Sequence, residues 1–275
     1  MRVTAEGAVR LFLAMATARS VVLNGDLGSG KSTVSHLLAR RLGIRRISVG
    51  DLYREMAKQR GMTALQLNLH AELDDKIDFY VDRLQSDLAA SGEQLIVDSR
   101  LAWFFFTDAL KVHLITDPAV AAQRVLGRPA DTVEGYSSVE EAQERLASRS
   151  ESERTRFLSR YGADKTRLRN YDLVCDSTSA PPQEIVERIV ENLMSPRGET
   201  VVCIDPSRVA ADPGRGVAGP VRFGYARPDF FAVSGADAVV EAAKLGQSLV
   251  EGTLAVEAGE SWQGLTADEM LAGIR

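Results

Sequence analysis

The stretch Gly25-Asp26-Leu27-Gly28-Ser29-Gly30-Lys31-Ser32-Thr33 decides the fold of this 275-residue chain. It follows a β-branched run, 20–24, and precedes residues 34–43, whose apolar spacing is helical and which end in glycine. A strand, a loop of the pattern G-x-x-x-x-G-K-S and a helix, in that order, predict a phosphate-binding loop. Its glycines let backbone N–H groups and the helix N-terminus face an anion. We therefore expect nucleotide phosphates here, with Lys31 bridging the β- and γ-phosphates and the Ser32 hydroxyl ligating Mg²⁺.

The composition is that of a globular protein with more chain than one ordinary domain needs. Hydrophobic residues make up 45% and charged residues 26% of the sequence, which excludes a disordered or collagen-like chain. Cys175 and Cys203 cannot build a disulfide framework. A single bridge between them is an alternative, but two isolated cysteines fit a reducing compartment better, so we expect a cytoplasmic protein. The isolated histidines His36 and His113 are expected to be structural. No apolar run reaches the roughly 18 residues of a membrane span, and we expect no membrane association.

The negative charge is unevenly distributed along the chain. The formal net charge is −5, and residues 200–275 hold six Lys/Arg against ten Asp/Glu. The total disfavours a generic nucleic-acid-binding protein. The preceding residues are nearly neutral with local basic clusters, which points to a small anionic ligand for that part of the chain.

A second strand-like segment, 94–97, ends at Asp98. Because ligands gather at the carboxyl ends of parallel strands, Asp98 is the candidate to complete a Mg²⁺ site with Ser32. Arg100 points to the same side and could pair with an acceptor phosphate. Upstream, Ser48 or Asp51 is a plausible helix cap, and Arg54 lies on the first turns of that helix. These two residues fit either an acceptor site or a capped helix with a solvated arginine.

The stretch 145–169 is a basic cluster with eight Lys/Arg and three Asp/Glu. Five of its charged residues are spaced 4, 4, 3 and 4 apart and share one helix face: Arg145, Arg149, Glu153, Arg156 and Arg160. Alone, such a stripe favours a solvated helix with i,i+4 ion pairs. Downstream of a phosphate loop, it also fits a mobile lid whose arginines close over transferring phosphates.

Together these residues resemble the cytidylate kinase family, particularly its shorter archaeal-type branch. The resemblance covers roughly residues 20–193. It rests on segments 25–33, 47–57, 60–62, 72–74, 77–78, Val97-Asp98-Ser99-Arg100-Leu101-Ala102-Trp103, 149–157, 161–162 and 171–174. The implied fold is α/β, a parallel five-stranded P-loop kinase sheet flanked by helices with an acceptor-binding insertion and a lid. The implied reaction is γ-phosphoryl transfer from ATP, with Mg²⁺, to CMP or dCMP.

The resemblance also implies roles for single residues. Ser48, Arg54 and Arg100 would contact the acceptor nucleotide, with Arg83 a further candidate. In the lid helix, Glu153 would accept a hydrogen bond from the cytosine amine while two arginines hold phosphates. The expected catalytic residues are Lys31, Arg128, Arg149 and Arg156.

Two positions depart from the family pattern. Ser99 stands where glycine is usual, and Ser150 where an acidic residue commonly follows the lid arginine. These departures leave the acceptor base open. Two other hypotheses therefore stand beside the first: a kinase for another small acceptor such as a modified deoxynucleotide, and a non-catalytic ATP-binding regulatory module.

We divide the chain into an N-terminal extension (1–17), a P-loop kinase domain (18–197) and a small C-terminal α+β domain (198–275). Three interpretations of the extension stand: a frayed N-terminal arm, residues that precede a true start at Met15, or a segment that weakly resembles a secretory signal peptide. The C-terminal part resembles a degenerate ParB/sulfiredoxin-like domain that lacks the His and Arg of that fold's phosphate chemistry. A generic α+β appendage is an equal alternative. In either case we expect it to dock an unidentified partner or to regulate the kinase.

Overall fold

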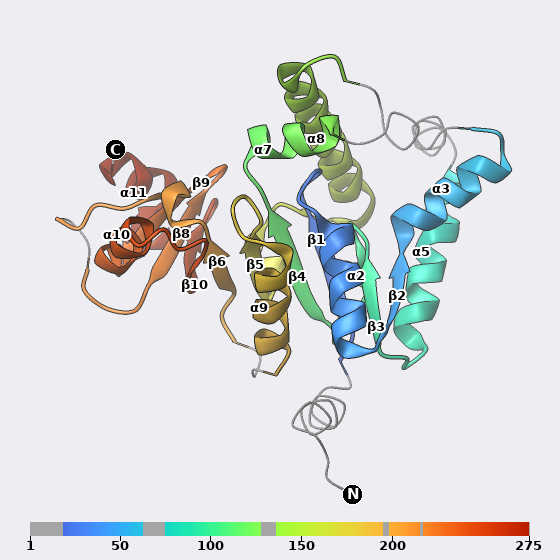
Figure 1. Cartoon of the computed structure of the whole chain (residues 1–275), viewed down its shortest axis with the longest axis horizontal. Coiled ribbons are helices and arrows are strands. Elements are labelled where there is room, and N and C mark those ends of the chain that lie inside the picture. Colours follow the sequence, from blue (N-terminus) through green and yellow to red (C-terminus); the bar gives the residue numbers. More distant parts are fainter. Residues whose placement is uncertain (1–18, 63–74, 128–135, 195–197, 215–216, 275) are drawn as a thin grey trace, which may run out of the picture.

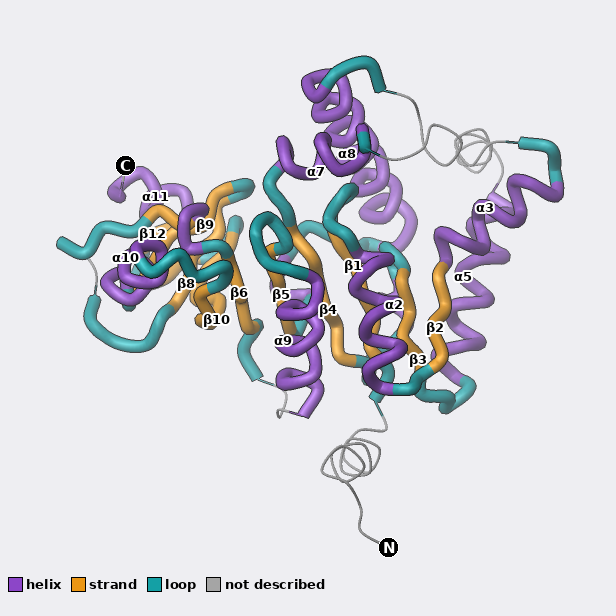
Figure 2. The backbone as a smooth tube through the Cα atoms, in the orientation of Figure 1, coloured by secondary structure: helices purple, strands orange, loops and turns teal. Residues whose placement is uncertain are grey.

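The computed structural model describes residues 19–62, 75–127, 136–194, 198–214 and 217–274. The predicted N-terminal extension, 1–17, and the expected catalytic Arg128 lie outside these residues. Figure 1 shows one twisted sheet running through the molecule, with helices packed against its faces. Figure 2 shows that loops join most strands to the helices that cover them. Within the described ranges, no helix combines the length and apolarity that crossing a bilayer requires.

The elements alternate along the chain. The strands are β1 (Val21–Gly25), β2 (Arg45–Ser48), β3 (Leu95–Asp98), β4 (Leu110–Ile115), β5 (Leu173–Asp176), β6 (Val201–Ile204), β7 (Val209–Ala210), β8 (Arg222–Ala226), β9 (Asp229–Ser234), β10 (Val250–Glu257), β11 (Ser261–Trp262) and β12 (Leu265–Thr266). The α-helices are α2 (Lys31–Leu42), α3 (Val49–Gln59), α5 (Asp75–Ala90), α6 (Ala102–Phe105), α7 (Pro118–Leu126), α8 (Val139–Tyr161), α9 (Pro182–Met194), α10 (Ala236–Lys244) and α11 (Ala267–Ile274). Two 3₁₀ turns, η1 (Leu168–Asn170) and η2 (Pro206–Arg208), complete them.

The first five strands form a parallel sheet in the order β2-β3-β1-β4-β5. Each is followed by a helix before the next strand of this region begins, as parallel connections require. This arrangement confirms the predicted α/β fold with a parallel sheet flanked by helices. It also places the carboxyl ends of all five strands at one edge of the sheet.

Local sequence signals set the limits of the helices. Asp117 caps α7 by accepting hydrogen bonds from the N–H groups of Ala119 and Val120, and Pro118 occupies the first turn. The side chain of Ser138 caps α8 in the same way, and Gly162 ends that helix in the left-handed conformation. These signals make α8 a 23-residue helix that contains the whole predicted charged stripe.

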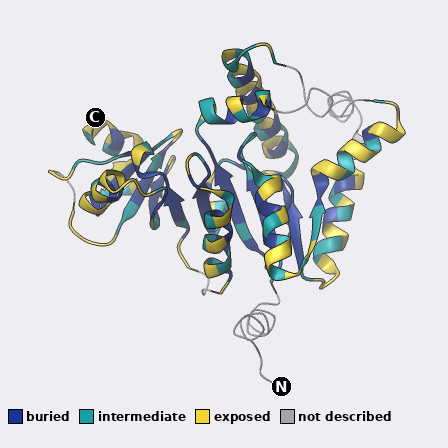
Figure 3. Cartoon of the chain, in the orientation of Figure 1, coloured by how far each residue is buried: buried dark blue, intermediate teal, exposed yellow. Residues whose placement is uncertain are grey.

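Two apolar layers cover the sheet. On one face, Val34 and Leu38 of α2 and Ile185 and Ile189 of α9 pack against the strands, and Figure 1 shows these two helices side by side. On the other face, α6, the end of α8 and α10 contribute to a second buried cluster, which includes Trp103, Phe157 and Val239. Figure 3 shows the buried strands between exposed helix surfaces.

The C-terminal segment 198–274 continues the same sheet. Strand β6 pairs in parallel with β5, and the sheet goes on through β10, β8, β9 and β7. Cys175 and Cys203 lie opposite each other in this pairing as buried free thiols. The boundary predicted between 197 and 198 therefore falls between two strands of one sheet. Whether the segment is a domain of its own, and whether it binds a partner, stay predictions.

Candidate active site

Strand register brings three separate segments together at the carboxyl edge of the sheet. Asp98 of β3 lies opposite Ser48 of β2 on one side and Leu23 of β1 on the other. Strand β1 ends two residues later at Gly25, where the predicted phosphate loop begins. Residues that are dozens of positions apart in the sequence thus share one small region.

Two glycines give the phosphate loop its shape. Gly28 and Gly30 both have positive φ, +86° and +78°, a conformation that glycine adopts without steric cost. A Cβ atom at Gly28 would lie 2.9 Å from the Ala121 Cβ of α7. The loop therefore passes closely against α7 before α2 begins at Lys31, with its N-terminus at this edge of the sheet.

Asp98 is the centre of the first charge cluster. Its carboxylate accepts a hydrogen bond from the Ser32 hydroxyl (3.0 Å) and one from Arg46 (2.9 Å), and the Lys31 Nζ lies 3.8 Å away. The Asp98 side chain is 6% exposed. An aspartate and a hydroxyl at this distance are oxygen ligands of the kind that Mg²⁺ takes beside phosphates and water. Ser32 and Asp98 therefore fit the predicted metal ion.

The predicted acceptor residues occupy two different settings. Ser48 is buried, and its hydroxyl caps α3 by accepting from the Asp51 N–H (3.2 Å). Arg54 is about half exposed and pairs with Asp51 beside this cap. Arg83 lies on the exposed side of α5, where its ion-pair partner is Asp87. The structure brings the first two to the edge of the site and leaves Arg83 away from both charge clusters.

Ser99, the first departure from the family pattern, is buried behind the site. Its hydroxyl donates to Gln85 of α5 (2.7 Å) and accepts from the Leu101 N–H (3.3 Å). Gln85 lies 14 positions before Ser99 in the sequence, and Leu101 lies two positions after it. In this structure the extra hydroxyl therefore joins α5 to the end of β3.

Glu153 is the centre of the second charge cluster. One carboxylate oxygen accepts from Arg100 and from Arg149 (3.3 Å), and the other accepts from Lys165 (2.9 Å). The side chain is 3% exposed. Burial by itself would raise the pKa of Glu153, but its three cationic neighbours outweigh burial and hold the pKa at about 2. Three contacts take up most of the acceptor capacity of a carboxylate.

The predicted stripe on α8 divides into a middle and two ends. Arg145 pairs with Glu141 within the helix (2.8 Å), and Arg160 lies 3.8 Å from Asp82 of α5. Between them, Glu153 turns inward and is buried. Arg156 lines an open groove along α8, whose other lining residues are Ser148, Glu151, Ser152, Thr155 and Ser159. One end of the stripe thus pairs within α8 and the other pairs with α5, while Glu153 in the middle is buried. Whether Arg156 takes part in the site stays a prediction.

The two clusters act on the same lysine of the phosphate loop. Burial lowers the pKa of Lys31, and the charges of Asp98 and Glu153 oppose that change. Arg100 and Lys165 act with burial. The inward part of α8 therefore lies within electrostatic reach of the phosphate loop.

His113 has the structural role that the sequence predicts. It is buried in β4, its Nδ1 lies 3.1 Å from the Asn24 side-chain nitrogen, and its ring stacks on Tyr171. Burial lowers the pKa of His113 to about 3, with smaller contributions from Lys165 and Lys31. The imidazole is therefore neutral at physiological pH.

Two residues of the site were missed by sequence reasoning. Arg46 bridges Asp98, Ser35 and Asp51. Its position two residues before Ser48 on a strand, and hence on the same face, is the signal that could have found it. Lys165 was counted in the basic stretch but no role was assigned, because its partner Glu153 lies twelve positions away across the end of a helix.

Known proteins are similar to this chain over more than half of its length. A family model described as an AAA domain matches residues 21–164, just over half of the chain. A cytidylate kinase of Methanobrevibacter smithii is 35% identical over 173 residues, which cover 63% of this chain and 97% of that protein. A cytidylate kinase of Natronomonas pharaonis is 36% identical over 177 residues, which cover 64% of this chain and 88% of that protein.

A solved structure is similar in fold. A protein of Eubacterium ventriosum described as uncharacterized superposes with a TM-score of 0.50 at 16% identity, covering 65% of this chain and 99% of that one. This similarity concerns the arrangement of strands and helices alone. The two cytidylate kinases show the family as well as the fold, since this chain spans nearly their whole length at identities above 30%. With its strand–loop–helix phosphate loop and these relatives, the chain belongs to the cytidylate kinase family.

Proposed function

We propose that this protein transfers the γ-phosphoryl group of ATP to CMP or dCMP. The observation that carries the proposal is the meeting of two charge clusters at one sheet edge, with Lys31 of the phosphate loop under the influence of both Asp98 and Glu153. The relatives named cytidylate kinases support the acceptor class. A nucleoside monophosphate kinase follows from the family, and the cytosine base is the finer part of the proposal.

The reaction needs no covalent intermediate on the protein. An oxygen of the acceptor's phosphate attacks the γ-phosphorus, the bond from that phosphorus to the β–γ bridging oxygen breaks, and ADP leaves with the electron pair. Positioning and charge then supply the catalysis. Lys31 would hold the β- and γ-phosphates, while Arg149 and Arg156 would neutralise charge on the group in transit.

Ser32 and Asp98 would hold Mg²⁺ beside the phosphates of ATP. When bound, the ion would neutralise negative charge on those phosphates. The carboxylate of Asp98 already faces the cations Lys31 and Arg46. In the proposed site these side chains would keep the carboxylate oriented toward the phosphate loop.

The acceptor would lie on the β2 and β3 side of the loop. Ser48, Arg54 and Arg100 are the residues proposed to contact it. Arg100 now pairs with Glu153, so that an incoming phosphate would compete with this carboxylate for the guanidinium. Glu153, once partly released, would be able to accept from the cytosine amine.

An acceptor screen tests the proposal directly. The purified full chain would be incubated with ATP and Mg²⁺ and each of CMP, dCMP, UMP, AMP and modified deoxynucleotides, and ADP formation would be measured. Turnover with CMP or dCMP at least about tenfold faster than with the other acceptors is the expected result, because a hydrogen-bonded base edge discriminates strongly. Turnover only with another acceptor would replace the cytidylate assignment.

The same screen addresses the regulatory alternative. ATP binding would be measured separately by calorimetry. Binding of ATP without turnover of any acceptor would favour a non-catalytic nucleotide-binding module. The variant Lys244→Ala, an exposed lysine at the end of α10, serves as a matched control for lysine variants of the phosphate loop.

A further inference from the structure

The two sides of the phosphate loop differ in which strands border them. The acceptor residues proposed above follow β2 and β3, whereas β4 and β5 lie on the other side of β1. In-line transfer places the acceptor and the leaving group on opposite sides of the transferred phosphorus. If the proposed function holds, the nucleoside of ATP must therefore lie toward the loops that follow β4 and β5.

These two loops are joined to each other and to the phosphate loop by hydrogen bonds. The Thr116 N–H after β4 donates to Asp26 of the phosphate loop (3.4 Å). The Asp117 N–H donates to the Thr178 hydroxyl in the loop after β5 (2.8 Å). Arg124 of α7 donates to the Ser177 carbonyl oxygen in the same loop (2.6 Å). A displacement of the loop after β5 would thus be transmitted to the phosphate loop through these hydrogen bonds.

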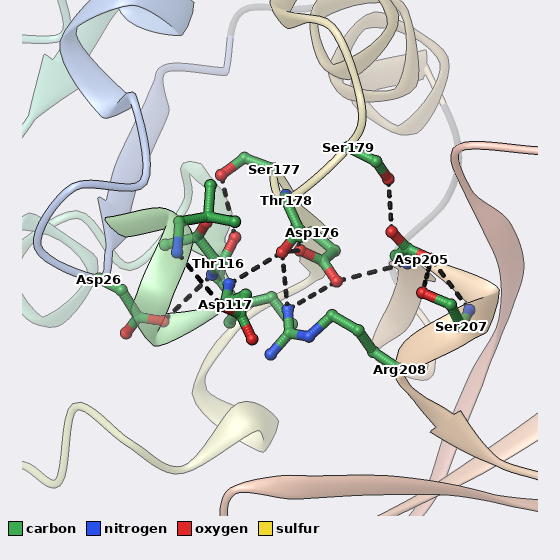
Figure 4. A network of polar contacts seen from close by, with 12 residues as sticks. Asp26, Thr116, Asp117, Asp176, Ser177, Thr178, Ser179, Asp205, Ser207 and Arg208 are labelled. Carbon is green, nitrogen blue, oxygen red and sulfur yellow. Dashed lines mark hydrogen bonds and ion pairs between the residues drawn. The ribbon is translucent and has the colours of Figure 1, made fainter. Parts of the chain in front are cut away.

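Residues of the C-terminal segment also hold the loop after β5 by hydrogen bonds. Arg208 of η2 donates to the carboxylate of Asp176 (2.7 Å) and to the Thr178 hydroxyl (3.1 Å). Asp205 accepts a hydrogen bond from the Ser179 hydroxyl (2.5 Å). Figure 4 shows Arg208 reaching across to Asp176 and Thr178, with Asp26 and Thr116 beyond them.

The charge of Arg208 matters because Asp176 is fully buried. Besides Arg208, the contacts to this carboxylate come from the N–H and hydroxyl of Thr178 and from the Asp205 N–H. A buried carboxylate that loses its cation is strongly destabilised, so the loop would rearrange or take in water. Arg208 also acts on the phosphate loop itself: burial raises the pKa of Asp26, and the charge of Arg208 is among the influences that oppose it.

We propose that Arg208 is a positioning residue for the ATP side of the site, so that the C-terminal segment is a working part of the kinase. It acts through Asp176 and Thr178, which fix the loop 177–181 against α7 and the phosphate loop. The proposal rests on the proposed function only in naming ATP as the nucleotide on this side. The contacts themselves lie in a segment beyond the 21–164 match of the family model.

Steady-state kinetics of Arg208→Ala tests the proposal. We expect the KM for ATP to rise about tenfold, the effect of losing a hydrogen bond to a charged group, while the KM for CMP changes less than about twofold. Arg208→Lys restores the charge and should recover much of the loss. Arg188→Ala is the matched control, since it also removes an ion pair between α9 and β10 (3.3 Å) but touches neither loop.

Three outcomes would overturn the proposal. They are an unchanged KM for ATP in folded Arg208→Ala, an equal rise in the KM values of both substrates, and an equal rise in the Arg188→Ala control. If Arg208→Ala does not fold, Arg208→Lys and Ser179→Ala still decide, with an expected rise of about two- to threefold in the KM for ATP. If the wild type phosphorylates no acceptor, the proposed function fails, and calorimetric ATP affinities of the same variants test the positioning role alone.

Discussion

The two carboxylates of the site, Asp98 and Glu153, are both buried and both surrounded by cations, yet they are held in place differently. Asp98 ends a strand whose neighbours on both sides are fixed by backbone pairing, and its partners Ser32 and Arg46 come from the adjoining strand–helix units. Glu153 lies in the middle of a long helix, and its partners come from the loops at 100 and 165 and from one turn earlier in the helix.

This difference separates a rigid part of the site from one that charge holds together. The geometry around Asp98 would survive the loss of a cation, since the sheet still aligns its strands. Around Glu153, the attraction between one acid and three bases brings α8 against the loops. We therefore expect changes near Asp98 to act mainly on turnover and changes at Glu153 to act mainly on stability.

Lys31→Ala tests the rigid part of the site around Asp98 and should give the largest loss of turnover. Turnover should fall by about 1,000-fold, because a preorganised charge on the transferring phosphate is lost, while the midpoint of thermal unfolding stays near that of the wild type. The assay is ADP formation with the acceptor found in the screen, and Lys244→Ala is the control. Near-normal turnover would end the assignment of the phosphate loop.

Glu153→Gln tests the part held by charge. Three cations would lose their common partner in a buried position, and unfolding free energy should fall by about 3 kcal/mol in urea titrations. In the wild type, the pKa of Glu153 is lower in the folded than in the unfolded state. The stabilisation by its carboxylate is therefore present above pH 4.5 and is lost as the pH falls toward 2. Glu151→Gln, on the exposed side of α8, should leave the urea midpoint unchanged. Equal midpoints for the two variants would contradict the comparison.

Arg149→Ala and Arg156→Ala ask whether the middle of α8 takes part in chemistry. Turnover should fall by about 100-fold, more than ATP binding weakens, since charges of a lid act mainly in the transition state. Arg145→Ala, one turn earlier and paired with Glu141, should keep its turnover. If binding and turnover decline equally, the stripe has only a structural role.

The smallest expected effect is the pH dependence of stability that His113 causes. Burial lowers the pKa of His113, and Lys165 of the Glu153 cluster and Lys31 of the Asp98 cluster lower it further, so His113 reports on both clusters. The folded-state pKa of about 3 lies below the unfolded value, so stability should decrease as pH falls below 6.5. The loss between pH 7 and pH 5 should be about 2 kcal/mol. His113→Gln should remove this slope in urea titrations, and the exposed His36→Gln should keep it. An identical slope in His113→Gln would exclude the buried imidazole as its cause.

Residues close together in sequence were the ones that sequence reasoning interpreted well. The phosphate loop, the cap at Ser48 and the stripe on α8 are local patterns with a fixed spacing, and the structure contains each of them. Arg46 and Lys165 were missed because their partners Asp98 and Glu153 belong to other elements. The role of Arg208 was missed for the same reason, since its partners lie about thirty positions earlier.

The sequence by itself determined that this protein has a phosphate-binding loop on a parallel α/β sheet and the residue series of the cytidylate kinase family. Those features depend on glycine conformation, apolar periodicity and spacing, which are properties of short segments. Only the tertiary structure decided that Glu153 faces inward among three cations and that the C-terminal segment continues the kinase sheet. Both results come from pairing between distant strands and from the burial of charge, which depend on contacts that a linear sequence does not display.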